Sequence, residues 1–347
     1  MSIPKAVLYF SPVSVWSAAV LLALEEKGYG DDEVDRRQVN LGRGENFNPT
    51  FLRLNPKATV PTLVVPLQRT LANDTESRYK AIVETKAIIE FLDKSRSVIS
   101  RTRTTSSAPA PTLTPATIAF ATTSTTIIDD ILHSEGGNPD SLRYLNACDQ
   151  VTLQVLASKN LPSLTEKFQA LESYLSDVQN HVSEKVRSLW RDKKAETMVL
   201  LEVYRNADKP NDQLDNDELT KRTEFFKVAR DGWGNALREI LTRLNKEIIG
   251  PYALGDQLST ADLHLAAWMA RIVSLAEGAA HDDGNTAIRR LEERIGSGFL
   301  LSRDFQLADT RPQHHELEPG YQSKLAAFWD AVRERPSWKK VYANGLY

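Results

Sequence analysis

Cysteines for disulfides and histidine motifs for metal ions are scarce in this sequence. There is a single cysteine among 347 residues, Cys148, so no disulfide can form within the chain. The six histidines include no HExxH motif, the spacing that places two zinc ligands on one helix face. We therefore expect no metal cofactor, and the lack of paired cysteines favours a reducing, cytoplasmic location.

Long apolar runs and an excess of basic residues are missing as well. The longest apolar runs, such as AAVLLAL at 18–24, fall far short of the roughly 20 residues that span a bilayer. The first residues lack the basic, apolar and small-residue segments of a signal peptide. A formal net charge of −3 gives no support to nucleic-acid binding. Neither a membrane nor a nucleic acid is therefore expected as a partner.

Short strands and helices alternate in the first part of the chain. Residues 5–10 and 35–41 have strand-like patterns on either side of a helix at 15–27, which predicts a parallel βαβ unit. The remaining elements are expected as a short helix ended by Pro56, strands at 59–66 and 77–84, and a helix at 84–94. This βαβαββα order predicts a small α/β domain over residues 1–94.

The composition changes after that domain. Residues 95–116 are dominated by serine, threonine and proline, which predicts a linker or surface insert. Residues 117–347 show helical patterns and no strand pairs, so a second, all-helical domain is expected there. Its most apolar segment, STADLHLAAWMARIVSLAEG at 259–278, predicts a buried central helix.

Three serines stand at the start of the first helix, in the segment SPVSVWS: Ser11, Ser14 and Ser17. One capping hydroxyl is enough for a helix start, and capping is the ordinary role of such a residue. The unpaired N–H groups at a helix N-terminus favour an anion, and a hydroxyl donor beside a thiolate lowers the pKa of the thiol. The surplus hydroxyls therefore indicate a bound group.

Two further segments are candidates for ligand contacts. Pro61 in TVPT cannot donate to a central strand ladder, so it marks an edge, a bulge or a cis bond. A cis bond would turn the backbone of Val60 outward, where an extended peptide could pair with it. Glu84 and Thr85 open the third helix, where they suit an ammonium and a carboxylate respectively. Each feature has an ordinary structural explanation, and only their combination indicates a site.

These segments resemble the glutathione transferase superfamily. LYFSPVSVWSAAVLLALEEKGY is similar to the first strand, catalytic loop and helix of the family, and NLGRGENFNPTFLRLNPKATVPTLVV to the loop that leads to its cis-proline. ETKAIIEFLDK is similar to its Glu/Gln-Ser segment, with Thr85 in place of serine. LGDQLSTADLHLAAW resembles its N-capping box, in which Ser259 caps and Asp262 reaches back. The pattern is most similar to fungal members, and it implies a thioredoxin-like domain followed by a helical bundle.

The resemblance also implies which residues bind glutathione. Ser14 would stabilise the thiolate, with Ser17, Ser11 and Tyr9 as alternatives. Cysteine stands at none of these positions, which disfavours thiol–disulfide exchange and omega-type reductase chemistry. The implied glutathione-binding residues are Asn46, Lys57, Thr59, Val60, Pro61, Glu84 and Thr85. Trp16, Phe120 and Trp233 are the candidate walls of an electrophile pocket, although a core role suits each of them equally well.

The resemblance implies a cytoplasmic detoxifying transferase that conjugates or thiolyses small hydrophobic electrophiles, with glutathione as co-substrate. A homodimer is implied too. Residues 67–78 fall near the segment through which the family dimerises, and a long loop there would alter the usual interface. The alternative is a carrier or regulator that binds glutathione or a hydrophobic ligand without turnover, since a fold does not determine activity. A structural partner protein that uses the Ser/Thr/Pro-rich insert is a third reading.

Overall fold

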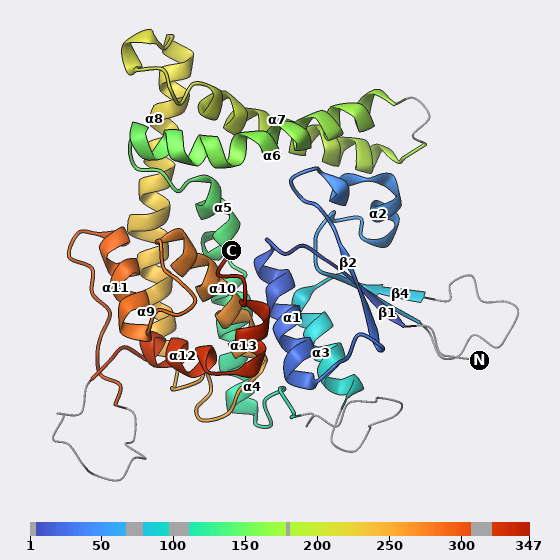
Figure 1. The fold of residues 1–347 in the computed structure, drawn as a ribbon, viewed down its shortest axis with the longest axis vertical. Coiled ribbons are helices and arrows are strands. Elements are labelled where there is room, and N and C mark those ends of the chain that lie inside the picture. Colours follow the sequence, from blue (N-terminus) through green and yellow to red (C-terminus); the bar gives the residue numbers. More distant parts are fainter. Residues whose placement is uncertain (1–4, 67–78, 97–110, 178–180, 307–320) are drawn as a thin grey trace, which may run out of the picture. The chain divides into compact units, whose positions relative to one another are not determined.

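The structure, a computed structural model, describes residues 5–66, 79–96, 111–177, 181–306 and 321–347 (Figure 1). Most of the predicted linker at 95–116 lies outside the described residues, as does the segment 67–78 near the implied dimer interface. No helix in the described part of the chain is both long enough and apolar enough to cross a bilayer.

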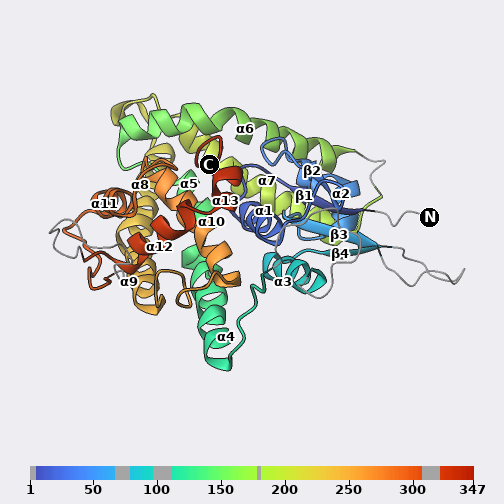
Figure 2. The ribbon, with the colours of Figure 1, turned by 60° about the horizontal axis from the view of Figure 1, so that its bottom comes forward.

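Four strands form one mixed sheet in the order β2-β1-β3-β4 (Figure 2). β1 (Ala6–Phe10) runs parallel to β2 (Val34–Gln38), whereas β3 (Thr62–Pro66) is antiparallel to both β1 and β4 (Tyr79–Ile82). Leu8 and Leu63 face each other across the β1–β3 pair, and both are completely buried. With α1 (Val15–Lys27), α2 (Pro49–Leu54) and α3 (Thr85–Ser95), these strands confirm the predicted βαβαββα order and the thioredoxin-like domain.

The first helix ends where its sequence predicts. Gly28 has φ 69°, in the left-handed region, and its N–H donates to Glu25 O at 3.0 Å. The Tyr29 N–H donates to Leu24 O at 2.9 Å, which completes a Schellman motif. Glycine adopts this conformation without the steric cost that a side chain would add.

The second strand is shorter than the predicted 35–41. Its ladder ends at Gln38, although the Val39 N–H still donates to Phe10 O at 2.7 Å. The next N–H, that of Asn40, donates to the Glu45 carboxylate at 2.7 Å, and the Glu45 N–H donates to Asn40 O. This local turn competes with the strand, so Leu41 lies in the turn instead of in the sheet.

The chain forms two compact units that do not follow its linear order. We call residues 1–17, 30–88 and 141–230 the sheet unit, and residues 18–29, 89–140 and 231–347 the helical unit. The domain limits at 94 and 117 stay a prediction, because these units group residues by contact and not by family domain.

The sheet unit includes a pair of long helices besides the sheet. α6 (Gln150–Ser176) and α7 (Glu184–Arg205) lie side by side, joined by an apolar cluster that includes Leu164 and Leu201 (Figure 1). α6 begins with a capping box in which the Asp149 side chain accepts from the Thr152 N–H. α5 (Pro139–Tyr144) precedes them, and the 3-10 turn η4 (Asn211–Gln213) and α8 (Asn216–Asp231) follow.

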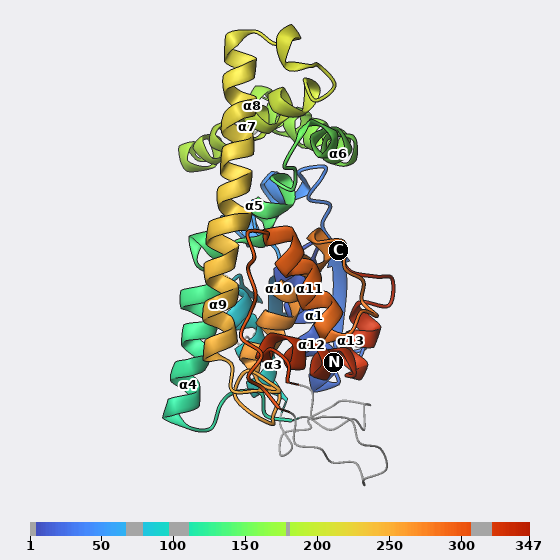
Figure 3. The same ribbon diagram turned by 90° about the vertical axis from the view of Figure 1, so that its left-hand side faces the viewer.

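The helical unit is built around α10 (Thr260–Leu275), whose residues 260–273 are all buried (Figure 3). The other helices are α4 (Ile118–Thr125), α9 (Arg238–Glu247), α11 (Gly284–Ile295), α12 (Lys324–Arg333) and α13 (Pro336–Val341), with π-helical turns η2 (Thr126–Leu132) and η5 (Gly232–Leu237) and the 3-10 turn η3 (Glu135–Gly137). Among the described residues after 117 there are only isolated β-bridges, as the helical prediction requires.

The predicted capping box at the start of α10 is confirmed. The Asp262 carboxylate accepts the Ser259 N–H at 2.7 Å and the Ser259 hydroxyl at 2.6 Å. Its other oxygen accepts the Ala253 N–H at 2.6 Å. Burial disfavours the charged form so strongly that, despite these donors, it raises the pKa of Asp262 to about 6.

Candidate functional site

The three serines at the start of α1 form one small hydrogen-bonded turn. Ser14 is the N-cap, because its Oγ accepts the Ser17 N–H at 3.2 Å. The Oγ of Ser17 in turn accepts the Ser11 N–H at 3.2 Å, and the Ser14 N–H donates to Ser11 O at 3.1 Å. The hydroxyl oxygens of Ser14 and Ser17 therefore both accept a backbone hydrogen bond within this turn.

All three serines are buried. Ser14 is 5 % exposed, whereas Ser11 is 2 % and Ser17 0 % exposed. Since the Ser14 oxygen accepts the capping hydrogen bond, its own proton is left to donate to a group at the helix start. Anions are favoured at the same place by the N–H groups of the first turn. This geometry suits an anion that is held by one hydroxyl and a helix end.

The peptide bond between Val60 and Pro61 is cis, which confirms one of the three predicted alternatives. β3 begins after it, at Thr62. Within the described residues, the N–H and C=O of Val60 take part in no hydrogen bond. They are the two backbone groups with which an extended ligand would pair.

Asn55 holds this loop, and the sequence reasoning did not identify it. The side chain is completely buried. Its Nδ2 donates to Thr59 O at 2.8 Å and to Thr62 Oγ1 at 3.0 Å, and its Oδ1 accepts the Lys57 N–H at 3.0 Å. The available signal was the Asn-Pro dipeptide, since asparagine before proline favours a turn.

Asn46 faces the same loop from the 3-10 turn η1 (Glu45–Phe47). It is buried, and its Nδ2 donates to Ala58 O at 2.8 Å. Ala58 has φ 55°, a left-handed conformation that this hydrogen bond helps to hold. Asn46 Oδ1 is buried and accepts no hydrogen bond from the described residues. Its observed contact is therefore with the loop, next to Lys57 and Thr59.

Lys57 and Glu84, both implied glutathione-binding residues, form an ion pair with each other. Lys57 Nζ lies 2.5 Å from Glu84 Oε1, and the two side chains are 66 % and 60 % exposed. Such exposed pairs contribute only about 0–1 kcal/mol, so a ligand with an ammonium and a carboxylate can replace the contact. Thr85, at the start of α3, is 7 % exposed.

The three candidate pocket aromatics have different surroundings. Trp16 is half-buried in the first turn of α1, in the sheet unit. Phe120 on α4 is 39 % exposed, and Trp233 in η5 is 4 % exposed beneath the Arg294 guanidinium, which lies 4.7 Å from its ring centre. The last two belong to the helical unit. A shared pocket for the three stays a prediction.

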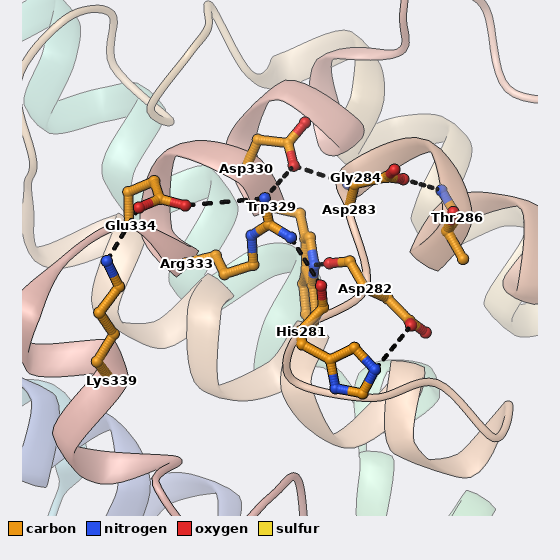
Figure 4. Close-up of polar contacts among 10 residues, drawn as sticks. All are labelled: His281, Asp282, Asp283, Gly284, Thr286, Trp329, Asp330, Arg333, Glu334 and Lys339. Atoms are coloured by element: carbon orange, nitrogen blue, oxygen red, sulfur yellow. Dashed lines mark hydrogen bonds and ion pairs between the residues drawn. The ribbon is translucent and has the colours of Figure 1, made fainter.

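The helical unit has an open hollow of about 800 Å³ beside Arg333 and His281. Two cations beside it contact Glu334, with Lys339 Nζ at 2.9 Å and Arg333 Nη2 at 3.8 Å, and Arg333 also donates to the backbone carbonyl of His281 at 2.8 Å (Figure 4). The Trp329 indole donates to Asp282 O at 2.8 Å. These contacts attach the loop before α11 to α12. No group of metal-ligating side chains occurs among the residues that the structure describes.

Comparisons with known proteins identify similar sequences and similar folds. Residues 13–95 match the family described as glutathione S-transferase, N-terminal domain. Tetrachloro-p-hydroquinone reductive dehalogenase of Sphingobium chlorophenolicum is 46% identical over 63 residues, which are 18% of this chain and 24% of that protein. Glutathione S-transferase TCHQD of Arabidopsis thaliana is 23% identical over 341 residues, 97% of this chain and 91% of that protein.

Among solved structures, Gtt2 from Saccharomyces cerevisiae is 20% identical with a TM-score of 0.41, and the alignment covers 96% of this chain and 99% of that one. A glutathione transferase homologue from Sulfitobacter with bound glutathione is 16% identical with a TM-score of 0.41 and covers 98% of both chains. The N-terminal domain match, with the full-length likeness to the Arabidopsis protein, supports the resemblance to the glutathione transferase superfamily that the sequence indicates.

Proposed function

We propose that this chain is a glutathione-dependent enzyme that conjugates or thiolyses a hydrophobic electrophile, with the thiolate stabilised by Ser14. One observation carries the proposal: the Ser14 Oγ accepts the Ser17 N–H at the start of α1. Its proton is consequently available to a sulfur anion at that helix end. Ser17 is the less suitable donor because it is completely buried.

We assign the remaining glutathione contacts from the cysteinyl backbone outward to the two ends of the tripeptide. The cysteinyl backbone pairs with the N–H and C=O of Val60, in the manner of an added strand. The γ-glutamyl ammonium meets Glu84, and its carboxylate meets Thr85 at the start of α3. The glycyl carboxylate meets Lys57, whose ion pair with Glu84 opens as the ligand binds.

The chemistry depends on the pKa of the bound thiol. A free thiol has a pKa of about 8.5, and each unit of lowering reflects about 1.4 kcal/mol of preference for the thiolate. The thiol proton leaves to solvent, the sulfur forms a bond to the electrophilic carbon, and a leaving group departs with its electron pair. The printed names of the two curated relatives, a reductive dehalogenase and a glutathione S-transferase, support this class of reaction.

Calorimetry with glutathione and conjugation assays on Ser14→Ala, Ser17→Ala and Ser11→Ala test the proposal. We expect Ser14→Ala to bind glutathione but to raise the pKa of the bound thiol and to lose most of the turnover. Full turnover in Ser14→Ala, with loss in either of the other two variants, would assign the role elsewhere. Binding of glutathione with no turnover of a broad electrophile panel would favour the carrier reading. A homodimer and a cytoplasmic location stay predictions.

A further inference from the structure

The helices α6 and α7 pack directly on the loop that contains the proposed glycyl-end contacts. Phe47, Leu52 and Ala58 from the loop region form one buried cluster with Leu171 of α6 and Trp190 of α7. All five residues belong to the sheet unit, and none is more than 5 % exposed. The helical pair therefore forms the wall against which residues 45–58 are held.

The loop sequence LGRGENF permits this close approach. A Cβ at Gly44 would lie 3.3 Å from Ala170 Cβ of α6, and Gly44 also has φ 67°. A Cβ at Gly42 would lie 3.1 Å from Ser163 Cβ. Larger residues at either position would push the loop away from the helix.

One directed contact crosses from α7 to the loop. The indole of Trp190 is completely buried, and its Nε1–H donates to Phe47 O at 3.0 Å. The ring stacks on Tyr174 with centres 5.4 Å apart. An indole nitrogen has one proton to donate, so this side chain can fix one carbonyl in one place.

Asn46 and Ala58 connect the Phe47 carbonyl to the proposed ligand contacts. Phe47 follows Asn46, whose Nδ2 donates to Ala58 O at 2.8 Å. Ala58 lies between Lys57, which is proposed to meet the glycyl carboxylate, and Thr59, an implied glutathione-binding residue. A shift of the Phe47 carbonyl would therefore move Asn46 and, through it, the backbone of these two residues.

We propose that Trp190 is a positioning residue for the glycyl end of glutathione, acting through Phe47, Asn46 and Ala58. This inference rests on the proposed function, because it needs glutathione to bind along the same loop. Trp190 touches neither the sulfur nor the electrophile in this scheme. Its loss should thus weaken binding without changing turnover at saturation.

The test compares Trp190→Phe with Trp329→Phe. Both substitutions remove a buried indole N–H that donates to a backbone carbonyl, but Trp329 donates to Asp282 in the helical unit. Dissociation constants are measured by calorimetry for glutathione and for γ-glutamylcysteine, which lacks the glycyl carboxylate. We expect Trp190→Phe to weaken glutathione about threefold to tenfold, the range for one lost buried hydrogen bond. The dipeptide constant and kcat at saturating glutathione should stay within about twofold.

The outcomes separate the two hypotheses. If the wild type binds glutathione and Trp190→Phe weakens both ligands equally, or neither, Trp190 has no positioning role. If the wild type binds neither ligand, the proposed function fails and this inference with it. Should Trp190→Phe not fold, Gly44→Ala disturbs the same contact from the loop side, and a selective loss for glutathione over the dipeptide is again required.

Discussion

Lys27 Nζ lies 2.8 Å from Asp93 Oδ1, and the two side chains are 1 % and 4 % exposed. Lys27 also donates to Pro111 O at 2.6 Å, while Asp93 accepts the N–H groups of Leu113 and Thr114 at 3.0 and 2.9 Å. Each charge thus has several partners, which is the condition under which a buried ion pair is tolerated. The pair joins the end of α1 to α3 and to the segment at 111–114.

Lys27→Met should destabilise the protein by about 3–5 kcal/mol, because it leaves the Asp93 carboxylate buried without its cation. Urea denaturation measures the effect. Lys94→Met is the matched control, since Lys94 is 70 % exposed and, among the described residues, pairs with Glu90 on the same helix. The control should change stability by less than about 0.5 kcal/mol. Equal effects from the two variants would mean that the buried pair has no special weight.

The pKa of Asp262 predicts a pH dependence of stability. Because burial raises its folded pKa to about 6, the folded protein holds this proton more tightly than the unfolded chain, where the value is about 3.9. Unfolding therefore releases a proton between these values, and the stability of the wild type relative to Asp262→Asn should fall as the pH rises from about 4 to 6. Above about 6 the difference should become constant.

Asp283→Asn is the control for this titration. Asp283 caps α11, and the hydrogen bond from the Thr286 N–H holds its pKa below the ordinary value. Its contribution to stability is present above the unfolded pKa and is lost only as the pH falls through the lower folded value. Denaturation curves of the two variants should thus have different pH profiles. If the free energy of unfolding of the wild type minus that of Asp262→Asn stays constant from pH 4 to 6, the prediction is wrong.

Arg335→Lys should lower the free energy of unfolding by about 1–2 kcal/mol. Arg335 makes two hydrogen bonds of 2.6 Å to the two oxygens of Glu26, whose side chain is 6 % exposed, and a lysine cannot reproduce this fork. Lys340→Ala is the comparison, because Lys340 makes one contact to Glu25 with its side chain 65 % exposed. Thermal unfolding that ranks the two variants in the opposite order would refute the assignment.

Lys57→Gln should weaken glutathione about tenfold while leaving the melting temperature unchanged, if Lys57 receives the glycyl carboxylate. The exposed ion pair with Glu84 explains why stability is insensitive to the change. Lys80→Gln, an exposed lysine on β4, controls for the lost positive charge. Calorimetry at two salt concentrations checks the result, since an ionic contact weakens with added salt. Unchanged affinity in Lys57→Gln would remove this residue from the site.

Local patterns were enough for several elements. The helix at 15–27 was predicted with the limits that α1 has, because its apolar spacing and Gly28 are signals within one stretch of chain. The capping box of Ser259 and Asp262 is equally local. The end of β2 was predicted wrongly, since the side chain of Glu45 takes the Asn40 N–H from outside the strand.

The sequence by itself determined the order of strands and helices in the first domain, the serine cap of α1 and the resemblance to glutathione transferases. Only the tertiary structure decided that Lys57 contacts Glu84 and that Trp190 reaches Phe47. The reason is physical: a periodicity or a cap involves neighbours within a few residues, and these leave a pattern in the chain. Contacts between residues 27 or 143 positions apart depend on how whole elements pack, and that arrangement leaves no local pattern.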